Sequence, residues 1–231
     1  MRRHLLATVM VSVATAGALI GNAGMANAAP APVHCYGLVA TIVRTTPSSV
    51  PIYGTERNDV IVGSSGNDTI YGGGGDDTIC GHEGVDVIRG GAGDDHIAGN
   101  DGNDYIYGEN GNDSLRGFYG NDHIYGGNGV DNIAGGDHNN NSMNWGDDWL
   151  YGDDGADGLE GSAGNDHLFA GTNSGIGDAL WAGKGNDYLS GINGQPNDAL
   201  LGQEGYDTCV GDQGDHILTS GDPHFTCEVL Q

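Results

Sequence analysis

The sequence contains little positive charge. Lysine and arginine together number 7 in 231 residues, against 32 aspartate and glutamate residues, so the formal net charge is −25 at pH 7. A nucleic-acid-binding surface needs clustered basic side chains, and this composition therefore excludes a nucleic-acid partner. Repulsion between carboxylates holds such a chain open until cations neutralise it, so we expect cation binding and folding to be one equilibrium.

The sequence also lacks the signatures of common catalytic sites. It contains no H-E-x-x-H motif, no serine nucleophile elbow and no nucleophile beside a base. We therefore expect no enzymatic activity, and the alternative is a hydrolase site built from Asp137, His138 and Trp145. After residue 20 no apolar run is long enough to cross a membrane, so no membrane span is predicted.

The N-terminus has the features of an export signal. Arg2 and Arg3 precede an apolar stretch over residues 5–20, and Ala26-Asn27-Ala28 matches the small-x-small cleavage rule. The sequence thus predicts a signal peptide over residues 1–28 that is cleaved, and a protein that is secreted and free outside the cell. A membrane anchor is the alternative, and the Gly/Ala-rich core with its cleavage site favours removal.

Glycine, at 45 of 231 residues, follows a nine-residue period together with aspartate. Over residues 63–134 the chain repeats the pattern G-G-x-G-x-D-x-U-x, in which U is a large aliphatic residue. The aspartates of this column step by nine from Asp59 to Asp131. A short fixed period of this kind is the signature of a solenoid.

Each repeat combines a turn with a short strand. The first six residues are mainly Gly, Asn and Asp, which suit tight turns with positive φ. The last three residues form a strand whose middle side chain points away from its neighbours, so we expect Ile70, Ile79 and Ile88 to stack inward. The turns place carboxylates beside bare carbonyl groups, and hard oxygen donors in a flexible loop are typical of Ca²⁺ sites.

The period loosens after Asp131. The next aspartate of the column is Asp148, 17 residues later, which indicates an eight-residue insertion within residues 137–145. Later steps of 12 and 11 residues lead to Asp178 and Asp198. We interpret this half as the same solenoid with stretched turns and a leucine core.

Segments outside the repeats differ in composition and serve as caps, because an open solenoid end exposes backbone groups and apolar core. We expect a strand over residues 35–44 to cover the first coil. The sequence divides into a signal peptide (1–28), an N-terminal cap and connector (29–53), a regular repeat region (54–134), an insertion loop (135–147), an irregular repeat region (148–218) and a C-terminal cap (219–231).

The four cysteines are Cys35, Cys80, Cys209 and Cys227. Export permits disulfide bonds, and three pairings are possible. Two cysteines lie near each end of the repeats, which favours Cys35–Cys80 and Cys209–Cys227, each tying a cap to a nearby coil. No C-x-x-C pair is present, so no zinc site is predicted.

The nonapeptides over residues 54–218 resemble the RTX, or haemolysin-type, calcium-binding repeats of bacterial exported proteins, and the chain looks like the small stand-alone secreted members. The resemblance implies an all-β fold, a right-handed parallel β-roll with two nonapeptides per coil. It also implies several Ca²⁺ ions between successive turns. The ligands that it implies are Asp68, Asp77, Asp86, Asp95, Asp104, Asp113, Asp122, Asp131, Asp148, Asp157, Asp166 and Asp187.

Two repeats per coil would place alternate repeats on opposite faces, and one face collects most of the aromatic residues. Such a face favours binding of a cell-envelope glycan or protein, although aromatic residues also suit exposed strand positions. The leading hypothesis is a secreted calcium-folded module, and the alternative is a cell-surface adhesin or carbohydrate-binding module. The candidate binding residues of this face are Tyr71, Tyr105, Tyr107, Tyr125, Trp149 and Tyr151.

Overall fold

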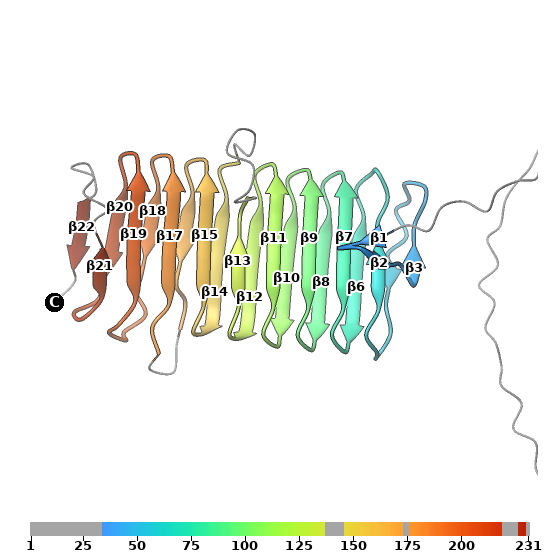
Figure 1. Cartoon of the computed structure of the whole chain (residues 1–231), viewed down its shortest axis with the longest axis horizontal. Coiled ribbons are helices and arrows are strands. Elements are labelled where there is room, and N and C mark those ends of the chain that lie inside the picture. The colour runs from blue at the N-terminus through green and yellow to red at the C-terminus, as the bar shows by residue number, and fades with distance from the viewer. Residues whose placement is uncertain (1–33, 137–145, 173–175, 219–225, 230–231) are drawn as a thin grey trace, which may run out of the picture. The chain divides into compact units, whose positions relative to one another are not determined.

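A computed structural model describes residues 34–136, 146–172, 176–218 and 226–229 (Figure 1). These residues contain 22 strands and no helix. Two short strands, β1 (His34–Cys35) and β2 (Leu38–Val39), form an antiparallel hairpin, and the other strands form two parallel sheets of ten strands each. None of the described residues forms a helix able to cross a membrane.

Alternate strands belong to alternate sheets. The even-numbered sheet contains β4 (Ile52–Tyr53), β6 (Thr69–Gly74), β8 (Val87–Ala92), β10 (Tyr105–Asn110), β12 (His123–Gly129), β14 (Trp149–Gly155), β16 (His167–Phe169), β18 (Tyr188–Ser190), β20 (Thr208–Gly211) and β22 (Thr226–Val229). The odd-numbered sheet contains β3 (Ile42–Val43), β5 (Val60–Val62), β7 (Thr78–Glu83), β9 (His96–Asp101), β11 (Ser114–Tyr119), β13 (Asn132–Ala134), β15 (Gly158–Ala163), β17 (Ala179–Lys184), β19 (Ala199–Glu204) and β21 (His216–Leu218).

Each strand of these sheets pairs with the strand two places further along the chain. Ile106 on β10 stands opposite Ile124 on β12, and Ile124 stands opposite Leu150 on β14. Two nonapeptides therefore make one coil, as predicted, and the fold is a parallel β-solenoid. The eight-residue insertion leaves this register intact; residues 137–145, with Asp137, His138 and Trp145, lie outside the described part of the chain.

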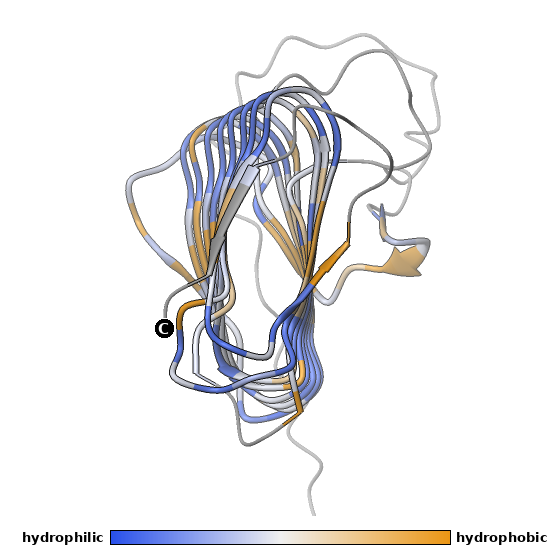
Figure 2. Cartoon of the chain, turned by 90° about the vertical axis from the view of Figure 1, so that its left-hand side faces the viewer, coloured by the Kyte–Doolittle hydropathy of each residue, from blue (hydrophilic) through white to orange (hydrophobic). Residues whose placement is uncertain are grey.

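The predicted inward column forms the core. Burial of each such side chain contributes roughly 1.5–3 kcal/mol, so the stacked column stabilises successive coils together with the hydrogen bonds between paired strands. Figure 2 shows the two sheets as facing walls with hydrophilic turns along both edges. The fully buried members of the column are Ile61, Ile70, Ile79, Ile88, Ile97, Ile106, Leu115, Ile124, Ile133, Leu150, Leu159, Leu168, Leu180, Leu189 and Leu200.

The turns of successive coils also pack closely against one another. At Gly102, φ is +146° and an added Cβ would lie 1.6 Å from the carbonyl oxygen of Gly84 in the preceding coil. A side chain at this position would therefore force the coils apart, which explains why glycine dominates the turns.

The N-terminal cap differs from the prediction. The expected strand over residues 35–44 is divided into β1, β2 and β3, because Tyr36 and Gly37 have φ of 49° and 82° and form the two-residue turn of the hairpin. β3 and β4 then make the first coil, so the solenoid begins before the first nonapeptide.

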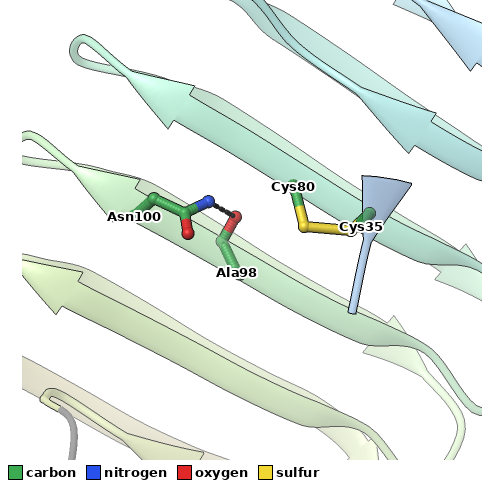
Figure 3. The surroundings of a disulfide bond; sticks show 4 residues. All are labelled: Cys35, Cys80, Ala98 and Asn100. Atoms are coloured by element: carbon green, nitrogen blue, oxygen red, sulfur yellow. Dashed lines mark hydrogen bonds between the residues drawn. A yellow bond between two sulfur atoms is a disulfide. The ribbon is translucent and has the colours of Figure 1, made fainter. Parts of the chain in front are cut away.

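The predicted bond between Cys35 and Cys80 is present and ties β1 to β7 (Figure 3). Cys209 is also disulfide-bonded, and Cys227 stands opposite it in the pairing of β20 with β22. The pairing Cys209–Cys227 stays a prediction that agrees with this register.

Candidate metal-binding turns

The column aspartates, which we define as the sixth residue of each repeat and its equivalent in the stretched turns, form a hydrogen-bond ladder along each edge of the solenoid. The backbone N–H of Asp86 donates to Oδ1 of Asp104, and the N–H of Asp104 donates to Oδ1 of Asp122, each at 2.8 Å. The ladder entering the even-numbered strands joins Asp68, Asp86, Asp104, Asp122, Asp148, Asp166, Asp187 and Asp207. The ladder entering the odd-numbered strands joins Asp59, Asp77, Asp95, Asp113, Asp131, Asp157, Asp178, Asp198 and Asp215.

The second carboxylate oxygen of most column aspartates is buried and has no hydrogen-bond partner among the described residues. A buried charged oxygen without a partner is strongly unfavourable, and a cation bound beside this row of atoms would offset that free-energy cost. Eleven of the predicted ligands share this feature, namely Asp77, Asp86, Asp95, Asp104, Asp113, Asp122, Asp131, Asp148, Asp157, Asp166 and Asp187.

Glycine keeps open the space around these oxygens. An added Cβ on Gly108, the first residue of its repeat, would lie 2.2 Å from Oδ2 of Asp113 and 2.5 Å from the carbonyl oxygen of Gly126 in the next coil. Carboxylate and carbonyl oxygens therefore border one small space that a side chain would fill. Hard oxygen donors of this kind fit Ca²⁺.

Burial also makes these carboxylates costly to ionise. Burial raises the pKa of Asp95 to about 7, with the neighbouring charges of Asp113 and Asp77 adding to the rise. Burial raises the pKa of Asp122 to about 9, and the charge of Asp148 in the next coil is the second cause. A cation between turns would offset both the burial and the repulsion.

The backbone must supply much of any coordination shell here. Among the described residues, no group of three or more His, Cys, Asp or Glu side chains converges closely enough to hold a metal ion. A Ca²⁺ ion between two turns would therefore combine column carboxylates with turn carbonyl groups, which suits a cation that accepts six to eight oxygens.

The first column aspartates have a different environment. Oδ2 of Asp59 accepts hydrogen bonds from the N–H and hydroxyl of Thr55, both at 2.8 Å. Oδ2 of Asp68, the first predicted ligand, accepts from the N–H of Ser64 at 2.6 Å and from its hydroxyl at 2.8 Å. Asp68 thus has protein donors where the eleven interior ligands have none among the described residues.

The stretched turns also bring their own donors. Oδ2 of Asp198 accepts a hydrogen bond from the side-chain amide of Asn193 at 2.9 Å. Asp198 and Asp207 continue the two ladders past the last predicted ligand, Asp187. The sequence-based ligand set ended at Asp187, although residues 202–207 retain both turn glycines and Asp207 follows Asp198 by nine residues.

A second ladder, which the sequence did not predict, runs beside each aspartate column. The residue before the column aspartate accepts the backbone N–H of its equivalent in the following coil. Oδ1 of Asp76 accepts from Asp94 at 3.1 Å, and Oδ1 of Asp94 accepts from Asn112 at 2.8 Å. The column ladder runs in the opposite sense, so each coil is tied to its neighbours by donors and acceptors in both directions. The recurrence of Asn and Asp at this position was the available signal.

Most aromatic residues of the even-numbered sheet form two stacked columns, and Tyr71 instead stacks on Tyr53 with ring centroids 5.1 Å apart. The ring centroids of Tyr107 and Tyr125 are 5.0 Å apart and those of Tyr125 and Tyr151 are 4.6 Å apart, with nearly parallel planes. These aromatic side chains therefore lie on one sheet, where neighbouring rings cover each other's flat sides, and a binding role for this face stays a prediction. The two columns are Tyr105, His123, Trp149 and His167, and Tyr107, Tyr125, Tyr151 and Phe169.

Comparison with known families agrees with this geometry. The model of the RTX calcium-binding nonapeptide repeat (4 copies) matches residues 53–88, 81–115, 116–141, 144–176 and 177–195, which together span more than half of the chain. A search of curated proteins finds no matching relative. With the aspartate columns, the glycine turns and the paired sheets, this match shows that the chain belongs to the RTX calcium-binding nonapeptide repeat family.

Proposed function

We propose that the protein is a secreted calcium-binding β-roll whose folding is coupled to Ca²⁺ binding. The observation that carries the proposal is the row of buried Oδ2 atoms on both edges that lack a hydrogen-bond partner among the described residues. Without cations the folded roll would bury like charges in successive turns. The unfolded chain leaves the same carboxylates in water, so the unfolded state is favoured without Ca²⁺ and the folded state is favoured when Ca²⁺ binds.

The proposed ligands are the eleven interior column aspartates together with turn carbonyl groups. Bound Ca²⁺ supplies positive charge between turns. The aspartates hold position through the Oδ1 ladder, and glycine keeps side chains out of the space beside Oδ2. Extracellular calcium sites typically bind at about 10⁻⁴ to 10⁻³ M, so the roll would fold outside the cell and remain unfolded at cytosolic calcium concentrations.

Secretion is supported by the disulfide chemistry. Cys35 and Cys80 are joined, and disulfide bonds form and persist in oxidising compartments. The predicted signal peptide over residues 1–28 lies outside the described residues.

The roll acts in this proposal as a structural and binding module, with no catalytic role. RTX repeats are a structural calcium-binding type. The residues of the alternative hydrolase site, Asp137, His138 and Trp145, lie outside the described part of the chain.

The alternative function, adhesion or carbohydrate binding through the aromatic face, stays a prediction. Sugars stack on the open flat side of an aromatic ring, and the rings of Tyr125 and Trp149 are each flanked by neighbours on both sides. A partner on this face would therefore meet ring edges and hydroxyl groups. Loss of glycan binding on replacing Tyr107, Tyr125 and Tyr151 together by leucine would support this alternative.

Circular dichroism during a calcium titration tests the proposed function. The mature, oxidised chain should change from an unfolded to a β-rich spectrum as Ca²⁺ rises through the millimolar range, and excess chelator should reverse the change. Mg²⁺ at equal concentration is the control, because it demands stricter octahedral geometry. A β-rich spectrum that is unchanged in excess chelator would sink the proposal.

A further inference from the structure

At the N-terminal end of the roll, protein groups lie beside the first column aspartate of each edge: hydrogen-bond donors reach both oxygens of Asp59, and Asp68 has donors to Oδ2 and an ion pair, without a hydrogen bond from the described residues, at Oδ1. Oδ1 of Asp59, which has no column aspartate before it, accepts a hydrogen bond from the hydroxyl of Thr41 at 3.3 Å. Thr41 lies 18 residues before Asp59, which is one coil, and it replaces the backbone donor of the interior turns. With the two bonds from Thr55, both oxygens of Asp59 have donors that require no metal.

On the other edge, Arg44 supplies a fixed positive charge. Its Nε lies 3.6 Å from Oδ1 of Asp68, and the Asp68 side chain is fully buried while that of Arg44 is 18% exposed. The Arg44 backbone N–H donates to the carbonyl of Val62 at 2.9 Å, which holds the residue against the second coil. A guanidinium group therefore stands beside the first carboxylate of a ladder whose interior members face like charges.

The hairpin β1–β2 clasps several coils at once. Cys35 on β1 is bonded to Cys80 on β7 and packs with Val62 and Ala98, so one cluster joins β1, β5, β7 and β9 (Figure 3). The ring of Tyr36 meets that of His96 on β9 edge-on, with centroids 4.1 Å apart. These contacts are covalent or apolar, and none of them depends on a bound ion.

We propose that the first two coils, β3 to β6, tied to β7 by the Cys35–Cys80 bond, form a clasp that folds without calcium and starts the calcium-driven winding of the remaining coils. The inference rests on the proposed coupling of folding to calcium. The first coil of a solenoid is the most costly to form, because it has no neighbour on which to stack. The clasp lowers that cost with the Cys35–Cys80 bond, with hydroxyl donors to the first aspartates and with the positive charge of the Arg44 side chain. Each later coil then adds onto a formed edge and needs Ca²⁺ only for its own turns.

Hydrogen exchange measured by mass spectrometry on the oxidised mature chain tests this inference. In excess chelator, amides of β5 and β6 should exchange at least about tenfold more slowly than amides of β10 to β14, because local stability sets exchange protection. Added Ca²⁺ should then protect the later strands to the same degree.

Matched variants identify the cause of the protection. The double variant Cys35→Ser/Cys80→Ser should lose the protection in chelator and should slow calcium-induced folding several-fold in stopped-flow circular dichroism. Cys209→Ser/Cys227→Ser is the control and should keep the N-terminal protection. Arg44→Gln, with the disulfide intact, should reduce protection of β5 and β6 by a smaller factor.

The possible outcomes separate the clasp from the proposed function. Uniformly fast exchange in chelator, followed by full protection with Ca²⁺, would leave calcium-coupled folding standing and overturn the clasp. Uniformly slow exchange in chelator with no gain on adding Ca²⁺ would overturn the coupling and, with it, any starting role for the clasp. Protection confined to the first coils in chelator supports both.

Discussion

Ser64 and Ser162 both occupy the second position of their repeats, yet only Ser64 donates hydrogen bonds to the column aspartate of its repeat. In the first turns, the N–H and hydroxyl of Ser64 both donate to Asp68. In the interior, Ser162 has φ of 83°, and among the described residues neither its hydroxyl nor Oδ2 of Asp166 has a hydrogen-bond partner.

The difference comes from the neighbouring coil and not from the residue type. Ser162 lies within β15 and is paired with Gly183 of β17, and its left-handed backbone belongs to that pairing. Ser64 lies outside any strand and turns its N–H toward the carboxylate. Similar turn sequences therefore give the column aspartate different hydrogen-bond partners according to the place of the turn in the stack.

The largest expected effect concerns pH: when a chelator removes Ca²⁺, protons should neutralise the column aspartates of the interior turns instead. Burial raises the pKa of column aspartates to values between about 6 for Asp77 and about 9 for Asp122, above the ordinary value of about 4. The folded roll without calcium then binds more protons than the unfolded chain, so this stability is full below about pH 4 and is lost as pH rises through the folded pKa values.

Circular dichroism in excess chelator should accordingly show more β-structure at pH 4 than at pH 8. Saturating Ca²⁺ should remove the difference at pH 8, since ions then occupy the turns. Greater β-content at pH 8 than at pH 4 in chelator would contradict the prediction.

Removing charge from neighbouring interior turns should weaken calcium binding. The double variant Asp104→Asn/Asp122→Asn should raise the calcium concentration at the folding midpoint by roughly tenfold, because ligand charge sets the affinity of such sites. Asp59→Asn, in the self-satisfied first turn, is the control and should leave the midpoint within about twofold. Equal shifts in the two variants would erase the distinction between the regions.

Filling the space beside an interior carboxylate should destabilise the calcium-bound roll. The added methyl group of Gly108→Ala would meet Oδ2 of Asp113, and overpacking of this kind costs about 1–3 kcal/mol. Gly158→Ala is the matched control, because its Cβ would lie 3.6 Å from the Trp181 ring, an ordinary contact. Urea unfolding in saturating Ca²⁺ measures both, and a stable Gly108→Ala roll would argue against the oxygen-lined space.

The smallest effect tests the two serines themselves. Ser64→Ala removes one hydroxyl donor to a buried carboxylate and should cost about 1 kcal/mol of unfolding free energy. Ser162→Ala removes a buried hydroxyl with no partner among the described residues and should be neutral or slightly stabilising. If the two variants unfold at the same urea concentration, the different hydrogen bonding of the two serines does not affect the free energy of unfolding.

Much of the fold was predictable because the period fixes it. A residue recurring every nine positions must return to the same place in each coil, so the buried isoleucines, the aspartate columns and the aromatic face followed from counting. The insertion after Asp131 was also predictable, since Asp148 resumes the pattern.

The parts that depend on three-dimensional neighbours were not predictable. Arg44 precedes the repeats and reaches Asp68 only through the first coil, so its role has no signal in the spacing. The hairpin turn at Tyr36-Gly37 interrupts a stretch that reads as one apolar strand. The stacking of the aromatic rings likewise required ring orientations, which composition does not contain.

The aspartate ladder has a consequence for how the molecule tolerates change in length. The bond from the N–H of one column aspartate to Oδ1 of the next is 2.8 Å long whether the two are 18, 21 or 26 residues apart, as for Asp104–Asp122, Asp166–Asp187 and Asp122–Asp148. The contact point, not the length of chain between contacts, sets the register. The edges of the solenoid therefore accommodate three or eight additional residues between contacts while the alignment of the coils is kept.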